Sequence, residues 1–198
     1  KIIWMNGEMI PWKEANVHVM SHALHYGSSV FEGIRGYSTK EGMKIFRLTD
    51  HMIRFFNSAK IYRMNINYDC AELIQVCKDV IIQNNLMNGA YIRPIAFLGL
   101  GEPGLAPKSD HKVDVAVAAW EWGTYLGSDA LEEGVDVCIS SWQRVAPNTI
   151  PAIAKAGGNY LSGQLISTEA KRLGFAEGIA LSTNGTVSEG AGENVFVI

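Results

Sequence analysis

The sequence has few cysteines and no arrangement that would pair them. Cys70, Cys77 and Cys138 are odd in number and form no C-x-x-C motif. This pattern argues against a disulfide framework, and buried apolar thiols in a reducing compartment are the simpler interpretation. We accordingly expect a cytoplasmic protein. No basic stretch followed by an apolar one, the pattern of a signal peptide, opens the chain.

Long apolar runs and a strong charge of either sign are also missing. The apolar run Val115–Trp120 is far too short to cross a bilayer. The net charge of −3 includes no basic stripe that could neutralise nucleic-acid phosphates. With 47% apolar and 19% charged residues the composition is that of a globular protein, for which we expect neither a membrane nor a nucleic-acid partner.

Three histidines have a spacing that could seat a metal ion on one helical face. His18, His22 and His25 follow the pattern H-x3-H-x2-H, but no nearby carboxylate or cysteine completes a ligand set. Their segment is rich in serine and glycine and predicts a loop or short turns. We therefore expect no metal site.

Turn residues and apolar runs predict a strand-rich chain. Asn6-Gly7 suits the type I′ turn of a hairpin, and Asn184-Gly185 marks a second turn. The expected strands are Ile2–Met5, Glu8–Ile10, Val30–Tyr37, Met43–Arg47, Ala90–Leu98, Val113–Trp120, Val135–Ser141, Gly178–Ser182 and Glu193–Ile198.

Capping residues and helical spacing predict three helices. Thr49 or Asp50 can cap a first helix that ends near Arg63. Asp69 and Glu72 form a capping box for the second. Its apolar positions, at helical spacing, are Leu73, Val76, Cys77, Val80 and Ile81. Asn159 can cap a third helix over Tyr160–Arg172, with Gly174 as its C-terminal glycine.

The mixture indicates an α+β protein of two domains. Glu121–Gly127 contains aromatic residues and glycines and is typical of a linker. We place a small N-terminal domain at residues 1–121, an interdomain loop at 122–128 and the first part of a larger domain at 129–198.

One lysine has surroundings that favour chemistry. Lys155 lies among small and apolar residues within Ala146–Tyr160, and Gly157 and Gly158 follow it. A lysine amine attacks carbonyls only when neutral, and apolar surroundings favour the neutral form. The flanking glycines would let the backbone approach a flat ring closely. A solvated loop lysine is the alternative interpretation.

Several motifs together resemble a known family. Ala146–Tyr160 and Glu189–Asn194 are similar to the fold-type IV enzymes that use pyridoxal 5′-phosphate (PLP). Glu32–Arg35 and Ala90–Pro94 narrow the resemblance to the bacterial branched-chain amino-acid aminotransferases. The resemblance covers essentially the whole chain. It implies the fold-type IV architecture of two domains joined by a loop, and a longer protein, because family members continue beyond the residue matching Ile198.

The resemblance implies four cofactor-binding residues. Lys155 would carry the cofactor and act as the catalytic residue. Glu189 would face the pyridine nitrogen, Tyr160 would donate to the ring oxygen, and Arg54 would bind the phosphate, with the rest of the phosphate cup supplied beyond Ile198. Taken singly, Glu189 could equally be an exposed turn residue, Tyr160 a core anchor and Arg54 a surface arginine.

The resemblance also implies a substrate pocket and an assembly. Phe31 would contact the substrate side chain, with Tyr26 of the partner subunit beside it, which implies a homodimer or an assembly of dimers. Tyr91 and Arg93, two residues apart on one strand, would share a face and bind substrate carboxylates. Trp122 and Tyr125 would close the pocket. Core packing is the alternative for each aromatic residue.

The implied activity is a transamination with small-molecule partners, namely amino acids and 2-oxo acids. Leucine, isoleucine or valine would exchange its amino group with 2-oxoglutarate by a ping-pong PLP mechanism. The alternatives within the fold are a D-amino-acid aminotransferase and an aminodeoxychorismate lyase. The alternative of another class is a non-catalytic fragment that cannot hold PLP.

Overall fold

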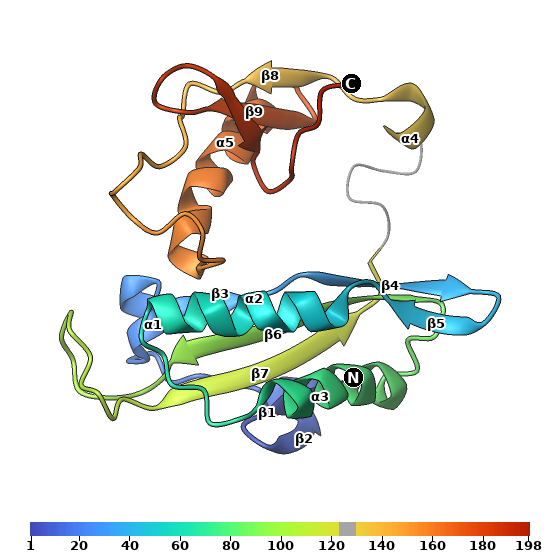
Figure 1. Cartoon of the computed structure of the whole chain (residues 1–198), viewed down its shortest axis with the longest axis vertical. Helices are drawn as coiled ribbons and strands as arrows, with labels where there is room; N and C mark the ends of the chain where they lie inside the picture. Colours follow the sequence, from blue (N-terminus) through green and yellow to red (C-terminus); the bar gives the residue numbers. More distant parts are fainter. Residues whose placement is uncertain (123–129) are drawn as a thin grey trace. The chain divides into compact units, whose positions relative to one another are not determined.

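The computed structural model describes residues 1–122 and 130–198 (Figure 1). The chain divides into two compact units. The first comprises Lys1–Trp122 and Ile153–Gly158, and the second comprises Gly123–Ala152 and Asn159–Ile198. The short segment that carries Lys155 thus packs with the first unit. The domain boundaries inferred from the sequence stay a prediction.

The first unit is built on an antiparallel sheet in the order β2-β1-β7-β6-β4-β5, with β3 paired to β6. A hairpin at Asn6-Gly7, both with positive φ, joins the first two strands, as predicted. The bounds are β1 Ile2–Met5, β2 Glu8–Pro11, β3 Ser29–Phe31, β4 Ile34–Thr39, β5 Gly42–Ile45, β6 Gly89–Leu98 and β7 Val113–Trp120.

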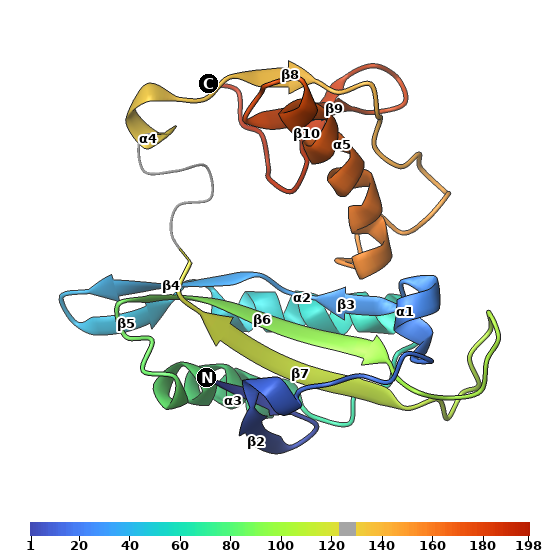
Figure 2. The same cartoon turned by 180° about the vertical axis from the view of Figure 1, so that it is seen from behind.

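Two long helices cover one face of this sheet (Figures 1 and 2). They are α2, Leu48–Ile61, and α3, Cys70–Gln83; a 3-10 turn at Trp12–Glu14 and α1, His22–Tyr26, precede them. The five apolar positions predicted for α3 are all buried, as the helical spacing requires. They join Met52 and Phe55 of α2 and Ile92 and Val115 of the sheet in one core. Each such large side chain contributes roughly 1.5–3 kcal/mol by leaving water.

The helix starts agree only partly with the sequence. The capping box of α3 is confirmed, because Asp69 Oδ1 accepts from the backbone N–H of Glu72 at 2.7 Å and Glu72 Oε2 accepts from that of Asp69. The cap predicted for α2 is wrong. That helix begins at Leu48 after Arg47 in a left-handed conformation, and no side chain caps it. The short helix α1 stands where turns were expected.

The second unit pairs a small sheet with one helix. The sheet has the order β10-β9-β8, formed by β8 Val137–Ile139, β9 Glu177–Leu181 and β10 Val187–Gly190. Helix α5 spans Tyr160–Arg172 as predicted, after a 3-10 turn at Gly157–Asn159, and α4 spans Ala130–Glu133. A Cβ at Gly163 would lie 2.2 Å from the carbonyl oxygen of Ala191, so glycine permits the close packing of α5 there.

Two predictions about the second unit need correction. Asn159 precedes α5 but makes no side-chain cap, and its Nδ2 donates instead to the carbonyl oxygen of Pro151 at 3.1 Å. The closing segment Glu193–Ile198 is not a strand. A strand needs a neighbour to satisfy its backbone groups, and the sheet of the described residues ends at β10 on that side, which leaves Phe196 82% exposed. No helix in the described ranges combines the length and apolar character needed to cross a membrane.

Candidate active site

The backbone of Lys155 is fixed to the first unit on both sides. Its N–H donates to Ser58 Oγ of α2 at 3.0 Å, and its carbonyl oxygen accepts from the N–H of Phe31 at 3.0 Å. Ala156 forms a β-bridge with Val30, and Ala154 and Ala156 are buried. The lysine is therefore held like a residue of an added edge strand beside β3. Its Nζ lies 5.1 Å from the centre of the Phe31 ring.

Glycines allow this close approach. A Cβ on Gly157 would lie 2.3 Å from Ser29 Oγ, a distance no real Cβ tolerates. Gly27, which ends α1 with a positive φ of 68°, would place a Cβ 3.1 Å from Gly158 Cα. The small residues after Lys155 therefore serve the contact with the first unit, where side chains do not fit.

Arg93 is the centre of an aromatic cluster next to this segment. Its guanidinium carbon lies 4.5 Å from the ring centre of Phe31, and its Nη2 donates to the hydroxyl of Tyr91 at 2.8 Å. The ring of Trp122 lies 4.5 Å from that of Tyr91, edge to face. Arg93 Nε is buried and has no hydrogen-bond partner among the described residues. A buried N–H of a charged group without an acceptor is costly, so this cluster suits a ligand that brings an acceptor.

Arg54 is oriented by a buried carboxylate. Glu32 is fully buried and accepts from Arg54 Nε at 2.5 Å and Nη2 at 2.7 Å, and from His51 Nδ1 at 2.8 Å. Burial raises the pKa of Glu32, but the hydrogen bonds and charges of Arg54 and His51 outweigh it, so the pKa lies below its usual value. The carboxylate is held ionised, and the arginine side chain stays 50% exposed.

Tyr26 is the remaining candidate of the first unit. Tyr26 belongs to α1, where its ring packs 4.5 Å from that of His22 and stays 48% exposed. His22 itself is occupied, with Nδ1 2.6 Å from Ser28 Oγ and Nε2 3.0 Å from the carbonyl oxygen of Gly104. Residues 1–122 and 130–198 contain no cluster of His, Cys, Asp and Glu that could hold a metal ion. Tyr125 lies outside the described residues.

Glu189 and Tyr160 belong to the second unit. Glu189 lies on β10 and accepts from Arg144 Nε at 2.7 Å. This pair lines a cavity of about 280 Å³ with Pro147, Ala152 and Ser182 among others. Tyr160 is the first residue of α5 and is partly exposed. A carboxylate paired with a guanidinium at the edge of a cavity can accept a further hydrogen bond from a cationic ring nitrogen.

Sequence reasoning missed four supporting residues, namely Glu32, His51, Ser58 and Arg144. His51 and Arg54 are three positions apart on α2 and so share a face, which was a usable signal for a common partner. Glu32 belongs to the motif Glu32–Arg35, from which no role of its own could be inferred. Nothing in the sequence around Arg144 or Glu189 indicates that these two side chains meet, because the pair joins a segment without regular structure to strand β10.

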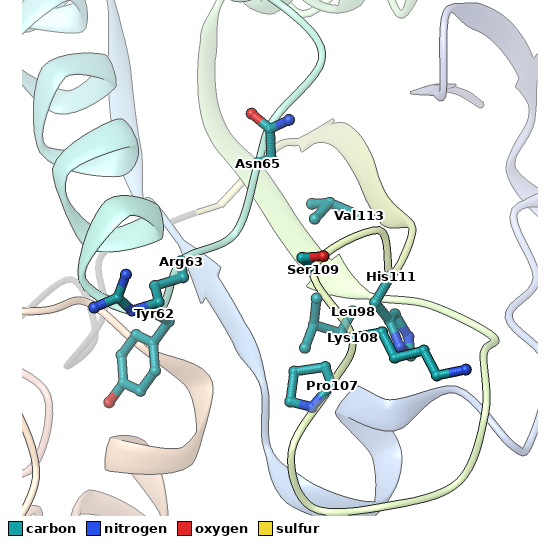
Figure 3. Close-up of a pocket in the computed structure, with 9 residues that line it drawn as sticks. All are labelled: Tyr62, Arg63, Asn65, Leu98, Pro107, Lys108, Ser109, His111 and Val113. Carbon is teal, nitrogen blue, oxygen red and sulfur yellow. The ribbon is translucent and has the colours of Figure 1, made fainter.

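A larger cavity of about 500 Å³ in the first unit contains none of the predicted site residues (Figure 3). It lies between the end of α2 and the loop that follows β6, and Arg63, Lys108 and His111 are among its lining residues. The side chains of Arg63 and Lys108 point away from each other (Figure 3). Lys108 pairs with Glu102 at 2.7 Å. The cavity therefore offers no convergent set of groups for a ligand.

Comparisons with known proteins agree with the geometry. Residues 29–198 match the family described as amino-transferase class IV, and the chain belongs to this family. It is 56% identical over 196 residues to the branched-chain-amino-acid aminotransferase of Escherichia coli (strain K12), covering 99% of this chain and 63% of that relative. The chain thus spans less than two thirds of the relative's length.

Solved structures show the same relationship. The crystal structure of the Escherichia coli branched-chain amino acid aminotransferase superposes with a TM-score of 0.94 at 55% identity, over 96% of this chain and 62% of that one. The branched-chain amino acid aminotransferase of Thermobaculum terrenum in its PLP-form gives 0.84 at 33% identity, over 97% and 62%. The family resemblance and the α+β, fold-type IV class inferred from the motifs are confirmed.

Proposed function

We propose that the protein is a PLP-dependent transaminase that moves amino groups between leucine, isoleucine or valine and 2-oxoglutarate. The observation that carries the proposal is the placement of Lys155 beside Phe31, whose ring also contacts Arg93. An amine, an apolar ring and a partly buried cation are brought to one place. The identity to branched-chain aminotransferases over nearly the whole chain supports the same reaction.

The residues present fit the cofactor. Arg54 offers a fixed, half-exposed guanidinium, which suits a phosphate, and Glu189 offers a carboxylate for the pyridine nitrogen. Tyr160 would donate to the ring oxygen. When bound, PLP supplies the electron sink for charge that develops at the substrate α-carbon. Lys155 would hold the cofactor and, once substrate replaces it, would move a proton between that α-carbon and C4′ of the cofactor.

The aromatic cluster supports the proposed substrate class. Phe31 and Trp122 offer apolar surface for a branched side chain. Arg93, with its buried Nε lacking an acceptor among the described residues, would receive the side-chain carboxylate of glutamate in the second half-reaction. One pocket would thus serve both partners of a ping-pong exchange. Tyr91 would hold Arg93 in place and contact the substrate carboxylate, and Tyr125 would complete the wall.

A second copy of the chain is the proposed partner. Around Tyr26, α1 and the neighbouring loops expose Val19 (70%), Leu24 and Leu105 (77%). The hydrogen bond between His22 and Gly104 and the bridge between Ser21 and Leu100 keep these segments together. Exposed apolar side chains of this kind are typical of protein interfaces. It supports a homodimer, or an assembly of dimers, in which Tyr26 reaches the partner's site. We propose a cytoplasmic location.

Borohydride reduction of the full-length protein with PLP tests the assignment of Lys155. We expect the reduced cofactor mass on the peptide that contains Lys155, and transamination of L-leucine with parallel double-reciprocal plots. Lys155→Ala should abolish both results. A Lys155→Ala protein that transaminates at a normal rate would exclude the mechanism, and turnover of D-alanine alone would assign another reaction of the same fold.

A further inference from the structure

The buried contact between Glu32 and α2 has a geometry that a simple fold contact does not require. Glu32 lies between β3 and β4, its side chain is fully buried, and its backbone N–H donates to the carbonyl oxygen of Pro94 at 2.9 Å. Both carboxylate oxygens are used, because Oε1 accepts from Arg54 and Oε2 accepts from both Arg54 and His51. The position of the carboxylate is therefore set by the sheet and by the helix together.

The contact fixes the plane of the Arg54 guanidinium. A bidentate arginine–carboxylate pair is directional, since two parallel N–H···O bonds hold the planar group in one orientation. The pair uses Nε and Nη2 of Arg54. The guanidinium has a second bidentate edge, formed by Nη1 and Nη2, and Glu32 orients that edge as well. His51 supports the carboxylate from the same face of α2, three positions away.

Stability alone is a weak explanation for this arrangement. Burying a charge costs free energy, and a buried ion pair is often no more stabilising than apolar side chains of the same size. The Glu32 side chain is fully buried, whereas that of Arg54 is half exposed. The free-energy cost of burying a charge therefore falls on Glu32, and the ion pair fixes the orientation of Arg54. Such an asymmetry is what a positioning group requires.

We propose that Glu32, supported by His51, is a positioning residue that orients Arg54 and so sets the affinity of the protein for the phosphate group of its cofactor. The inference rests on the proposed function, in which Arg54 binds that phosphate. It adds two residues that would never touch the cofactor. Their effect should appear only with ligands that carry the phosphate.

The test compares PLP with pyridoxal, which lacks the phosphate, in the full-length apoprotein. Dissociation constants for both are measured by absorbance and fluorescence in wild type, Glu32→Gln, His51→Gln and Arg54→Gln. We expect Glu32→Gln to weaken the binding of PLP about tenfold or more, which is the loss typical of one charge-assisted hydrogen bond. The same variant should change the binding of pyridoxal by less than about threefold. His51→Gln should give a smaller loss of the same kind.

Asp50→Asn is the matched control, because it removes another arginine–carboxylate pair from the same helix. Arg47 Nε donates to Asp50 Oδ2 at 2.8 Å, and both side chains are exposed. Neither dissociation constant should change. Circular dichroism and thermal melts verify the fold of each variant, and if Glu32→Gln does not fold, His51→Gln decides the question.

The outcomes separate the inference from the proposed function. If Arg54→Gln leaves the ratio of the two dissociation constants unchanged, Arg54 does not bind the phosphate and the proposed function is wrong on that point. Suppose instead that Arg54→Gln lowers the preference for PLP over pyridoxal, while the folded Glu32→Gln and His51→Gln variants change the affinity for both ligands equally, or for neither. That result overturns the positioning role of Glu32 and His51. In the Arg54→Gln background, Glu32→Gln should cause no further loss of PLP affinity.

Discussion

The backbone N–H of Phe31 donates to the carbonyl oxygen of Lys155 at 3.0 Å. Phe31 is the last residue of β3, and more than half of the chain length separates it from Lys155 in the sequence. Through this bond the position of the lysine depends on the sheet of the first unit. Phe31 also places its ring 5.1 Å from the lysine Nζ. The backbone and the side chain of one residue therefore both define the surroundings of the amine.

The contact predicts that Gly157→Ala destabilises the protein. A Cβ there would lie 2.3 Å from Ser29 Oγ, so Gly157→Ala forces the Ser29 hydroxyl to move away from the Lys155 segment. We expect a loss of roughly 1–3 kcal/mol in the free energy of unfolding, the usual range for overpacking, and weaker PLP binding. Urea denaturation and PLP titration measure the two effects.

Ser29→Ala supplies the control for this steric argument. Alone it should change stability little, and combined with Gly157→Ala it should recover most of the loss, because it removes the atom that the new Cβ meets. If the double variant is as unstable as Gly157→Ala, the clash with Ser29 is not the cause.

Local signals in the sequence predicted the parts of the fold that depend on local contacts. The capping box at Asp69 and the spacing of the apolar positions gave α3, and the Asn6-Gly7 turn gave the first hairpin. Strand β7 and helix α5 have the predicted bounds. In each case the residues that decide the structure lie within a few positions of one another.

The errors and omissions come from contacts between distant residues. Arg47 takes a left-handed conformation before α2, which no local cap would predict. Glu32 pairs with two residues of a helix that begins sixteen positions later, at Leu48, so its role depends on how the helix docks on the sheet. Among the site residues, motifs indicated Lys155, Tyr91 and Arg93, whereas Ser58, which accepts from the backbone N–H of Lys155, required the fold to be seen.

The capping box of α3 predicts a measurable loss on Asp69→Ala. The Asp69 carboxylate accepts from the backbone N–H of Glu72, which would otherwise lack a partner at the start of the helix. We expect a loss of about 1 kcal/mol in the free energy of unfolding by urea denaturation. Asp79→Ala, which removes an exposed contact with Gln75 on the same helix, should change it by less than about 0.5 kcal/mol. Equal losses for the two variants would contradict the cap.

The buried thiol of Cys77 should resist alkylation in the folded protein. Burial raises the pKa of Cys77 to about 12, because the thiolate would lie in the core beneath the sheet. Since only the thiolate reacts, about one thiol in ten thousand would be reactive at pH 8 even if reagent could reach it. Iodoacetamide followed by peptide mass spectrometry should label Cys138 but not Cys77, and unfolding in urea should expose both. Labelling of Cys77 at the rate of Cys138 in the native protein would contradict the burial.

The buried Nε of Arg93 predicts an asymmetry between the two half-reactions. The proposed acceptor for this cation is the side-chain carboxylate of glutamate, which leucine lacks. In Arg93→Gln of the full-length protein we expect kcat/KM for glutamate to fall by about a hundredfold, as for a lost bond to a charged group. For leucine it should fall by less than about tenfold, because the proposed apolar contacts with Phe31 and Trp122 do not involve Arg93. Single-turnover spectroscopy of each half-reaction measures the two constants separately, and leucine serves as the internal control. A loss of the same size for both substrates would show that Arg93 organises the pocket as a whole instead of recognising the glutamate side chain.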